Sequence, residues 1–252
     1  MGFLNKIFGK GTKTEQGTER KQGVQADQVT SIKEPECCTE QELIAKFGGI
    51  AFDKQCDFAE IIGNNNWNID MVKEEISFGP DLCFPIQVLA TFSYSSETWL
   101  WAWANSKSGL SEHIIEQSLL LKKYGEDNGI DLLHNNSFDF SKDELHLIGL
   151  IASGMFNTSA YYIADYGQGA MVVTIKSDFI DRQGKDDHHR ILSVFPQLIS
   201  QFEMNHKDAL LNYLKVKGYH ISGHDGQVFA RKEGNSITAV FDEQSRLLEL
   251  KG

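Results

Sequence analysis

The octet TWLWAWAN, at residues 98–105, is the part of the sequence that most strongly constrains the fold. At the two-residue period of a β-strand, Trp99, Trp101 and Trp103 lie on one face, and small or aliphatic residues lie on the other. The octet therefore predicts a strand that carries a continuous wall of three indoles. The opposite face would allow a helix to pack close to the sheet.

This wall of indoles has two interpretations. Inside the protein it forms one side of the hydrophobic core, and each indole N–H needs a hydrogen-bond partner. On the surface it could stack against a base, a sugar or an aromatic side chain of a peptide. Three exposed tryptophans promote aggregation, which favours the core, although one edge of the wall could still line a pocket. The candidate ligand or partner face consists of Trp99, Trp101, Trp103, Asn105 and Trp67.

The sequence before the octet alternates between apolar and polar residues as antiparallel strands do. Residues 84–92 place an apolar residue at every second position, and residues 93–97 form a hairpin loop that leads into the octet. Residues 67–71 and 76–78 alternate in the same way, with a turn between them. These segments together predict an antiparallel meander.

A helix precedes the meander. Thr39 and Glu42 form a capping box, and apolar residues recur at helical spacing from there to Ile62. Gly48 and Gly49 lie inside this helix, where each glycine costs about 1 kcal/mol relative to alanine. We therefore expect another part of the backbone to pass close to the helix at these two glycines.

The last third of the chain has its own pattern of helical segments followed by short strands. The strands are predicted at residues 220–222, 227–232, 236–241 and 246–250, with turn-forming residues between them. Residues 9–36 have the composition of a flexible linker. The fold class is therefore α+β: an antiparallel sheet packed with helices, a small C-terminal α/β unit and a flexible N-terminal tail. The predicted divisions are a tail at 1–36, a main α+β domain at 37–180 and a unit of helix plus antiparallel strands at 181–252.

The first eight residues differ from the linker that follows them. Phe3, Leu4, Ile7 and Phe8 fall on one side of a helix, with lysines opposite. Such a tip could contact a membrane surface, dock on a partner, or pack loosely on its own domain as a frayed end. One short amphipathic turn anchors weakly, so membrane contact through the N-terminus would be peripheral at most.

Six motifs carry a resemblance to a known family: FGxxAFxKQ at 47–55, AEIIG at 59–63, WxID at 67–70, QVLATF at 87–92, the octet, and KYGE at 123–126. These motifs resemble an uncharacterised bacterial family that is known only as a domain of unknown function. The similarity covers about residues 40–175, and Ala90 stands where the family has glycine. The resemblance implies a bacterial origin and a shared fold, and it implies no activity and no catalytic residues.

The charge of the chain restricts its partners. The net charge is −11, and residues 1–36 hold six Lys or Arg and five Asp or Glu, so the rest of the chain carries a net charge of −12. A folded part with this negative charge repels the phosphate backbone of nucleic acids, which argues against nucleic acid as a partner. A basic protein partner is compatible with this charge.

The sequence gives little support to catalysis. Cys37, Cys38, Cys56 and Cys83 match no zinc-binding spacing and are expected to be free thiols of a cytoplasmic protein. No phosphate-binding loop, nucleophile elbow or metalloprotease motif is found, and we predict no cofactor and no metal. The segment DDHH at 186–189 could ligate a metal, but a polar loop whose aspartate caps the next helix is favoured.

These observations favour a non-catalytic cytoplasmic module that binds another protein. The alternative is a small-molecule-binding domain or an enzyme with a pocket at the Trp-rich strand.

Overall fold

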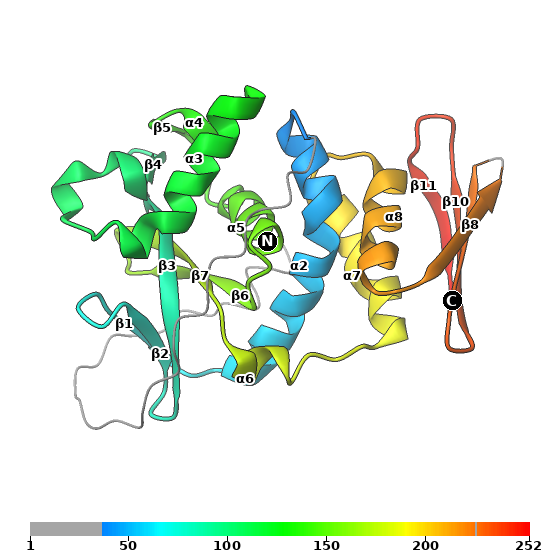
Figure 1. Cartoon of the computed structure of the whole chain (residues 1–252), viewed down its shortest axis with the longest axis horizontal. Helices are drawn as coiled ribbons and strands as arrows, with labels where there is room; N and C mark the ends of the chain where they lie inside the picture. The colour runs from blue at the N-terminus through cyan, green and yellow to red at the C-terminus, as the bar shows by residue number, and fades with distance from the viewer. Residues whose placement is uncertain (1–36, 225) are drawn as a thin grey trace.

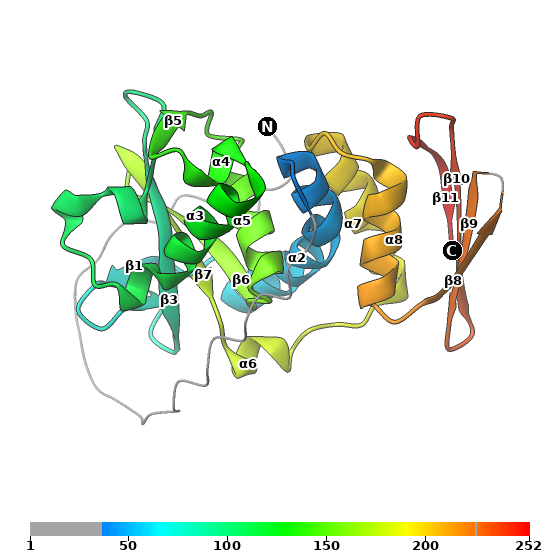
Figure 2. The same cartoon turned by 45° about the horizontal axis from the view of Figure 1, so that its top comes forward.

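The computed structural model describes residues 37–224 and 226–252. Two antiparallel sheets lie on opposite sides of the described structure, and a layer of helices lies between them (Figure 1, Figure 2). The arrangement confirms the α+β class. The predicted tail, with its tip Phe3, Leu4, Ile7 and Phe8, lies outside the described residues.

The larger sheet is organised around its longest strand, β3, which pairs antiparallel with β2, β4 and β7. β7 in turn pairs with β6, whereas β1 extends the sheet from β2 and β5 extends it from β4. The predicted antiparallel meander corresponds to the first four strands. The seven strands are β1 (Trp67–Asp70), β2 (Glu75–Phe78), β3 (Leu82–Ser93), β4 (Thr98–Trp101), β5 (Ser137–Asp139), β6 (Ala160–Asp165) and β7 (Gly169–Ile175).

The octet is a strand only in its first half. β4 ends at Trp101, and the next residues form the 3-10 helix η1 (Ala102–Ala104). β4 pairs with β3 as far as Ala90, and β3 is irregular between Val88 and Ala90, so β4 has no regular partner to continue against. The prediction of one strand over residues 98–105, with three indoles on one face, is therefore wrong beyond Trp101.

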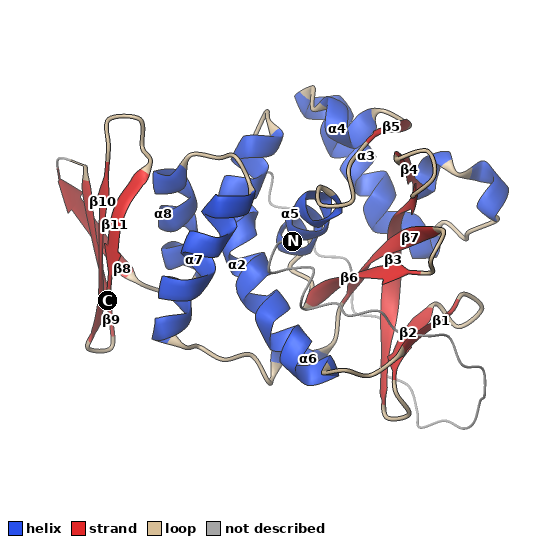
Figure 3. Ribbon diagram, turned by 180° about the vertical axis from the view of Figure 1, so that it is seen from behind, coloured by secondary structure: helices blue, strands red, loops and turns tan. Residues whose placement is uncertain are grey.

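Helices fill the space between the two sheets. α5 packs on one side of α2, and α7 and α8 pack on the other (Figure 3). α3 packs against β3, where the hydroxyl of Ser118 donates to the carbonyl of Leu89 at 2.8 Å. Among the described residues, no helix combines the length and apolarity that crossing a membrane requires. The helices are α2 (Glu40–Ile62), α3 (Glu116–Asn128), α4 (Asp131–His134), α5 (Leu145–Met155), α6 (Asp178–Asp181), α7 (His188–Gln201) and α8 (His206–Val216), with short 3-10 turns η2 (Ser106–Ser108) and η3 (His113–Ile115).

α2 is the central helix of this layer, and it begins at the predicted capping box. The Thr39 side chain accepts the N–H of Glu42, and the Glu42 carboxylate accepts the N–H of Thr39, each at 3.2 Å. At Gly49, a Cβ atom would lie 2.6 Å from the Cβ of Tyr213 in α8. The predicted close approach is confirmed at Gly49, where α2 and α8 come together, whereas a Cβ atom at Gly48 would meet only side-chain atoms of Ile44 and Leu198.

The smaller sheet is a meander of four strands in the order β11-β10-β9-β8. Its inner face carries apolar residues that are buried against the helices, whereas its outer face is exposed. α7 and α8 contribute to the same hydrophobic core as α2, so the predicted C-terminal unit packs directly onto the main domain. The four strands are β8 (His220–His224), β9 (Gln227–Lys232), β10 (Asn235–Phe241) and β11 (Leu247–Lys251).

Candidate functional site

The first two indoles of the octet lie in the hydrophobic core. Trp99 and Trp101 are fully buried, and their ring centroids are 5.1 Å apart. Trp101 Nε1 donates to the carbonyl of Leu132 at 3.2 Å, and Phe138 and Phe140 of the neighbouring chain segment cover Trp99. Neither indole can be reached from solvent, so for these two residues the expected ligand or partner face is corrected to a wall of the core.

The other three members of the predicted face are half-buried. Trp103 is half-buried, and the Nζ atom of Lys122 lies 4.6 Å from the centre of its ring. Asn105 is half-buried at the end of η1. Trp67 lies on the edge strand β1 and packs against Tyr162, in a second core cluster. A partner contact through Trp67, Trp103 or Asn105 remains a prediction.

The segment of aspartates and histidines before α7 is structural. Asp187 accepts the N–H of His189 at 2.9 Å and so caps α7, as the favoured interpretation expected. Asp186 pairs with Lys232 and lies 3.5 Å from Lys217. Over residues 37–224 and 226–252, no group of three His, Cys, Asp or Glu side chains is arranged to hold a metal ion.

A chain of buried charges joins α2 to the C-terminal unit. Asp53 accepts hydrogen bonds from Lys217 at 2.7 Å and from the hydroxyl of Tyr213 at 2.8 Å. Arg190 bonds to Asp57 and lies 3.4 Å from Asp53. Burial disfavours the Arg190 cation, but the hydrogen bond and charge of Asp57 outweigh it and raise the pKa of Arg190. Because these charges are paired with one another, we interpret them as a fixed joint between the two parts of the chain.

The smaller sheet leaves an open edge beside a helix. β8 pairs with β9 on one side, and no further strand of the described chain pairs with its other side. β8 follows α8 after a short turn and runs back in the opposite direction, inclining away from the helix (Figure 1). Every second residue of an edge strand directs its N–H and C=O away from its partner strand. The edge of β8 therefore offers main-chain hydrogen bonds to another extended chain.

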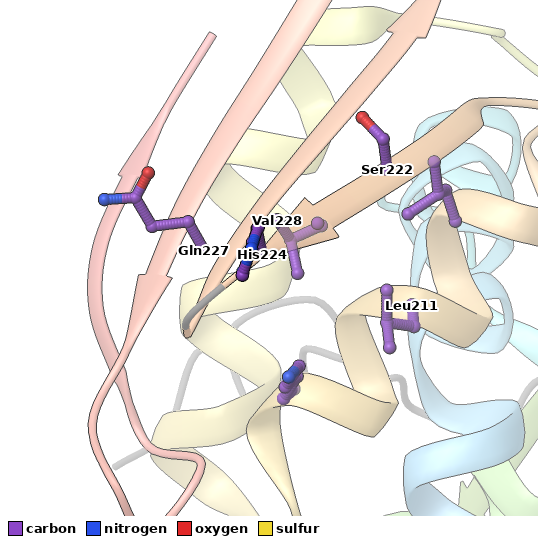
Figure 4. Close-up of a pocket in the computed structure, with 8 residues that line it drawn as sticks. Leu211, Ser222, His224, Gln227 and Val228 are labelled. Atoms are coloured by element: carbon purple, nitrogen blue, oxygen red, sulfur yellow. The ribbon is translucent and has the colours of Figure 1, made fainter.

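A pocket of about 460 Å³ lies between α8 and the end of β8. Gly223 lines this pocket and pairs with Val228 across the two strands. Leu211 on α8 and Val228 on β9 provide apolar walls on the helix side and the strand side (Figure 4). A Cβ atom at Gly223 would lie 2.7 Å from the carbonyl oxygen of Gln227, so this close backbone approach requires glycine. We call the open edge of β8 and this pocket together the β8 groove.

A second hollow, of about 550 Å³, lies between the first turns of α2 and α8. Two of its polar side chains already serve helix caps: Glu42 bonds to the N–H of Thr39, and Asn205 accepts the N–H of Asp208 at 3.0 Å. The β8 groove is the better candidate because its main-chain edge is open.

The β8 groove is not among the sites predicted from the sequence. Its strand was predicted, but nothing in the sequence placed α8 alongside that strand. One signal was present, because a glycine inside a strand often marks a close backbone approach, and Gly223 is such a residue. A second signal is the four-residue spacing of Lys207, Leu211 and Lys215, which puts these side chains on one side of α8.

The fold and the site define an α+β protein in which helices separate two antiparallel sheets and an edge groove lies in the C-terminal unit. The model of DUF6882, a family of unknown function, matches residues 41–178. This match spans more than half of the chain, and the chain belongs to that family. The β8 groove lies outside the matched residues. No curated protein and no solved structure matches the chain.

Proposed function

We propose that the protein is a non-catalytic binding module that holds an extended segment of another protein along the edge of β8. The observation that carries this proposal is the pocket beside Gly223, which places a hollow of mixed polar and apolar lining next to a strand edge that no other described strand pairs with. This is the geometry of β-strand addition, in which main-chain hydrogen bonds supply affinity and side-chain pockets supply specificity.

The bound segment would extend the smaller sheet from four strands to five. Side chains of an added strand alternate between the two faces of a sheet, so every second one would point toward α8. One of them would enter the hollow between Leu211 and Val228. An aliphatic side chain there contributes about 25 cal/mol for each Å² of apolar surface that it buries, in addition to the main-chain ladder.

The buried joint around Arg190 and Asp53 is a second observation that supports the proposal, because it bears on the rigidity of α8. It ties α2 to both α7 and the end of α8. These ion pairs hold α8 in place on α2, so the helix wall of the groove is fixed before binding. A groove with one wall fixed in advance loses less conformational entropy when its partner arrives.

The proposal includes a protein partner in the cytoplasm of a bacterial cell, and no nucleic acid. The free thiols of the four cysteines suit a reducing compartment. The net charge of −11 opposes binding to phosphate backbones. Contact of the N-terminal tip with a membrane would be peripheral at most.

The test is a selection of random dodecapeptides displayed on phage against the full-length protein, followed by affinity measurements on the selected peptides. Leu211→Trp fills the hollow, and Leu211→Gln keeps the size of the side chain but removes its apolar wall. Both should weaken the selected peptides at least about tenfold, since each removes a buried apolar contact. Thermal unfolding verifies that each variant is folded.

The matched control is Phe229→Ser, which changes the exposed outer face of the same sheet and should leave affinity unchanged. A selection that yields no peptide, or peptides insensitive to both Leu211 variants, would contradict the proposed function.

A further inference from the structure

We infer that the segment bound along β8 is acidic and carries two carboxylates four residues apart, with an apolar residue midway between them; this inference rests on the proposed function. Lys207, Leu211 and Lys215 recur every fourth residue of α8, so they lie along one side of the helix. Leu211 and Lys207 both line the pocket. We call Lys207, Leu211 and Lys215 the lysine stripe; it places one lysine on either side of the apolar side chain of Leu211.

The two lysines are available to a ligand. Neither Lys207 nor Lys215 forms an ion pair within residues 37–224 and 226–252, whereas Lys217 and Lys232 of the same unit pair with Asp53 and Asp186. The described residues that line the pocket include no Asp or Glu. The two lysines thus give the helix side of the β8 groove a positive charge that no described lining residue neutralises.

The spacing of the lysines matches the spacing of side chains on an extended segment. At a rise of 1.5 Å per residue, Lys207 and Lys215 are about 12 Å apart along α8. Residues i and i+4 of a strand are about 13 Å apart and point to the same face, and residue i+2 lies between them on that face. A segment with the pattern acidic-x-apolar-x-acidic therefore places its carboxylates at the lysines and its apolar residue at Leu211.

The distribution of charge along the chain favours the same partner. Residues 181–252 contain ten Lys or Arg and ten Asp or Glu, so this unit is neutral, whereas residues 37–180 contain eight and twenty. The acidic main domain repels an acidic segment, and the lysine stripe of the neutral unit attracts it. An acidic segment is thereby directed to the β8 groove.

The probes are three synthetic nonapeptides. Each has a central valine, with Glu two positions before and after it in the first, Gln in the second and Lys in the third, and Thr at all other positions. At low salt we expect the Glu peptide to bind the full-length protein about fivefold more tightly than the Gln peptide, with the Lys peptide weakest. The preference should shrink as salt rises, because exposed ion pairs are screened.

Replacing both lysines, Lys207→Gln with Lys215→Gln, should remove the preference for Glu over Gln. The matched control, Lys122→Gln with Lys123→Gln on α3, should leave it unchanged.

Equal affinity for the Glu and Gln peptides, both lost in Leu211→Trp, would overturn the inference and leave the proposed function intact. Failure of all three peptides to bind would also overturn the inference, and the phage-selected peptides then decide the proposed function separately. Binding of the Glu peptide that survives both lysine replacements at full strength would refute the role of the stripe.

Discussion

Replacing Arg190 by methionine would test whether the buried charges fix the C-terminal unit on α2. Methionine keeps much of the length of the side chain and removes its charge. Asp53 retains its contact with Lys217 at 2.7 Å. Asp57, which bonds to Arg190, retains only the backbone N–H of Lys185 at 3.0 Å. The substitution therefore leaves Asp57 as a buried carboxylate without a counter-ion.

The size of the effect follows from burial. The side chains of Arg190 and Asp57 are 10% and 9% exposed, so water cannot solvate the orphaned carboxylate well. Removing one partner of a buried ion pair costs about 3–5 kcal/mol. Because Glu60, the third carboxylate in contact with Arg190, is half exposed, we expect the lower end, about 3 kcal/mol. For a chain of this size this corresponds to a fall in Tm of about 6–12 °C.

The assay is urea denaturation followed by circular dichroism, together with thermal unfolding. Arg246→Met is the matched control, because its ion pair with Asp242 is exposed on the arginine side and should contribute less than about 1 kcal/mol. Adding Asp57→Leu to Arg190→Met should recover most of the loss, since a buried pair replaced by apolar residues is often as stable. If Arg190→Met lowers the free energy of unfolding no more than Arg246→Met does, the buried joint does not hold the C-terminal unit on α2.

Two further predictions concern the core. Burial lowers the pKa of His146 to about 4 from its ordinary value of 6.5, so the unfolded chain binds a proton there first as pH falls. The free energy of unfolding should therefore fall between about pH 6.5 and 4, and this group should account for about 2 kcal/mol of the fall at pH 5. Urea denaturation at pH 7.5 and 5 should show a smaller loss of stability in His146→Gln than in the unmodified protein. An equal loss in both would argue against a lowered pKa of His146. Gly49→Ala should cost about 1–3 kcal/mol in the same assay, because its Cβ would meet Tyr213 at 2.6 Å, close to the backbone of α8. In Gly48→Ala the new Cβ atom meets only side-chain atoms of Ile44 and Leu198, which can shift, so this substitution should cost less than Gly49→Ala. Equal effects would contradict the tight contact of α2 with α8.

Local chemistry explains which elements could be predicted from the sequence. Capping by Thr39 and Glu42 needs only residues three apart, and it is present as expected. The strands of the smaller sheet lie within two residues of the positions predicted, because alternation and turn residues are properties of short segments. The tight packing at Gly49 was also predicted, since an unfavourable residue inside a helix indicates a tertiary reason for its presence.

The elements that could not be predicted depend on distant parts of the chain. The octet turns into a 3-10 helix after Trp101 where β3 becomes irregular, and a residue pattern in one strand does not reveal a bulge in its partner. The buried joint between Asp53 and Arg190 spans 137 residues. The β8 groove depends on α8 lying beside β8, which is fixed by the packing of α8 on α2 and not by either segment alone.

The central claim, that another chain adds to the edge of β8, can be tested most directly by hydrogen–deuterium exchange with a phage-selected peptide. If the peptide pairs with the strand, its binding should slow the exchange of backbone amides within residues 220–224, and this protection should be lost in Leu211→Trp. Protection confined to the larger sheet or to β11, with β8 exchanging as it does in the free protein, would contradict the account.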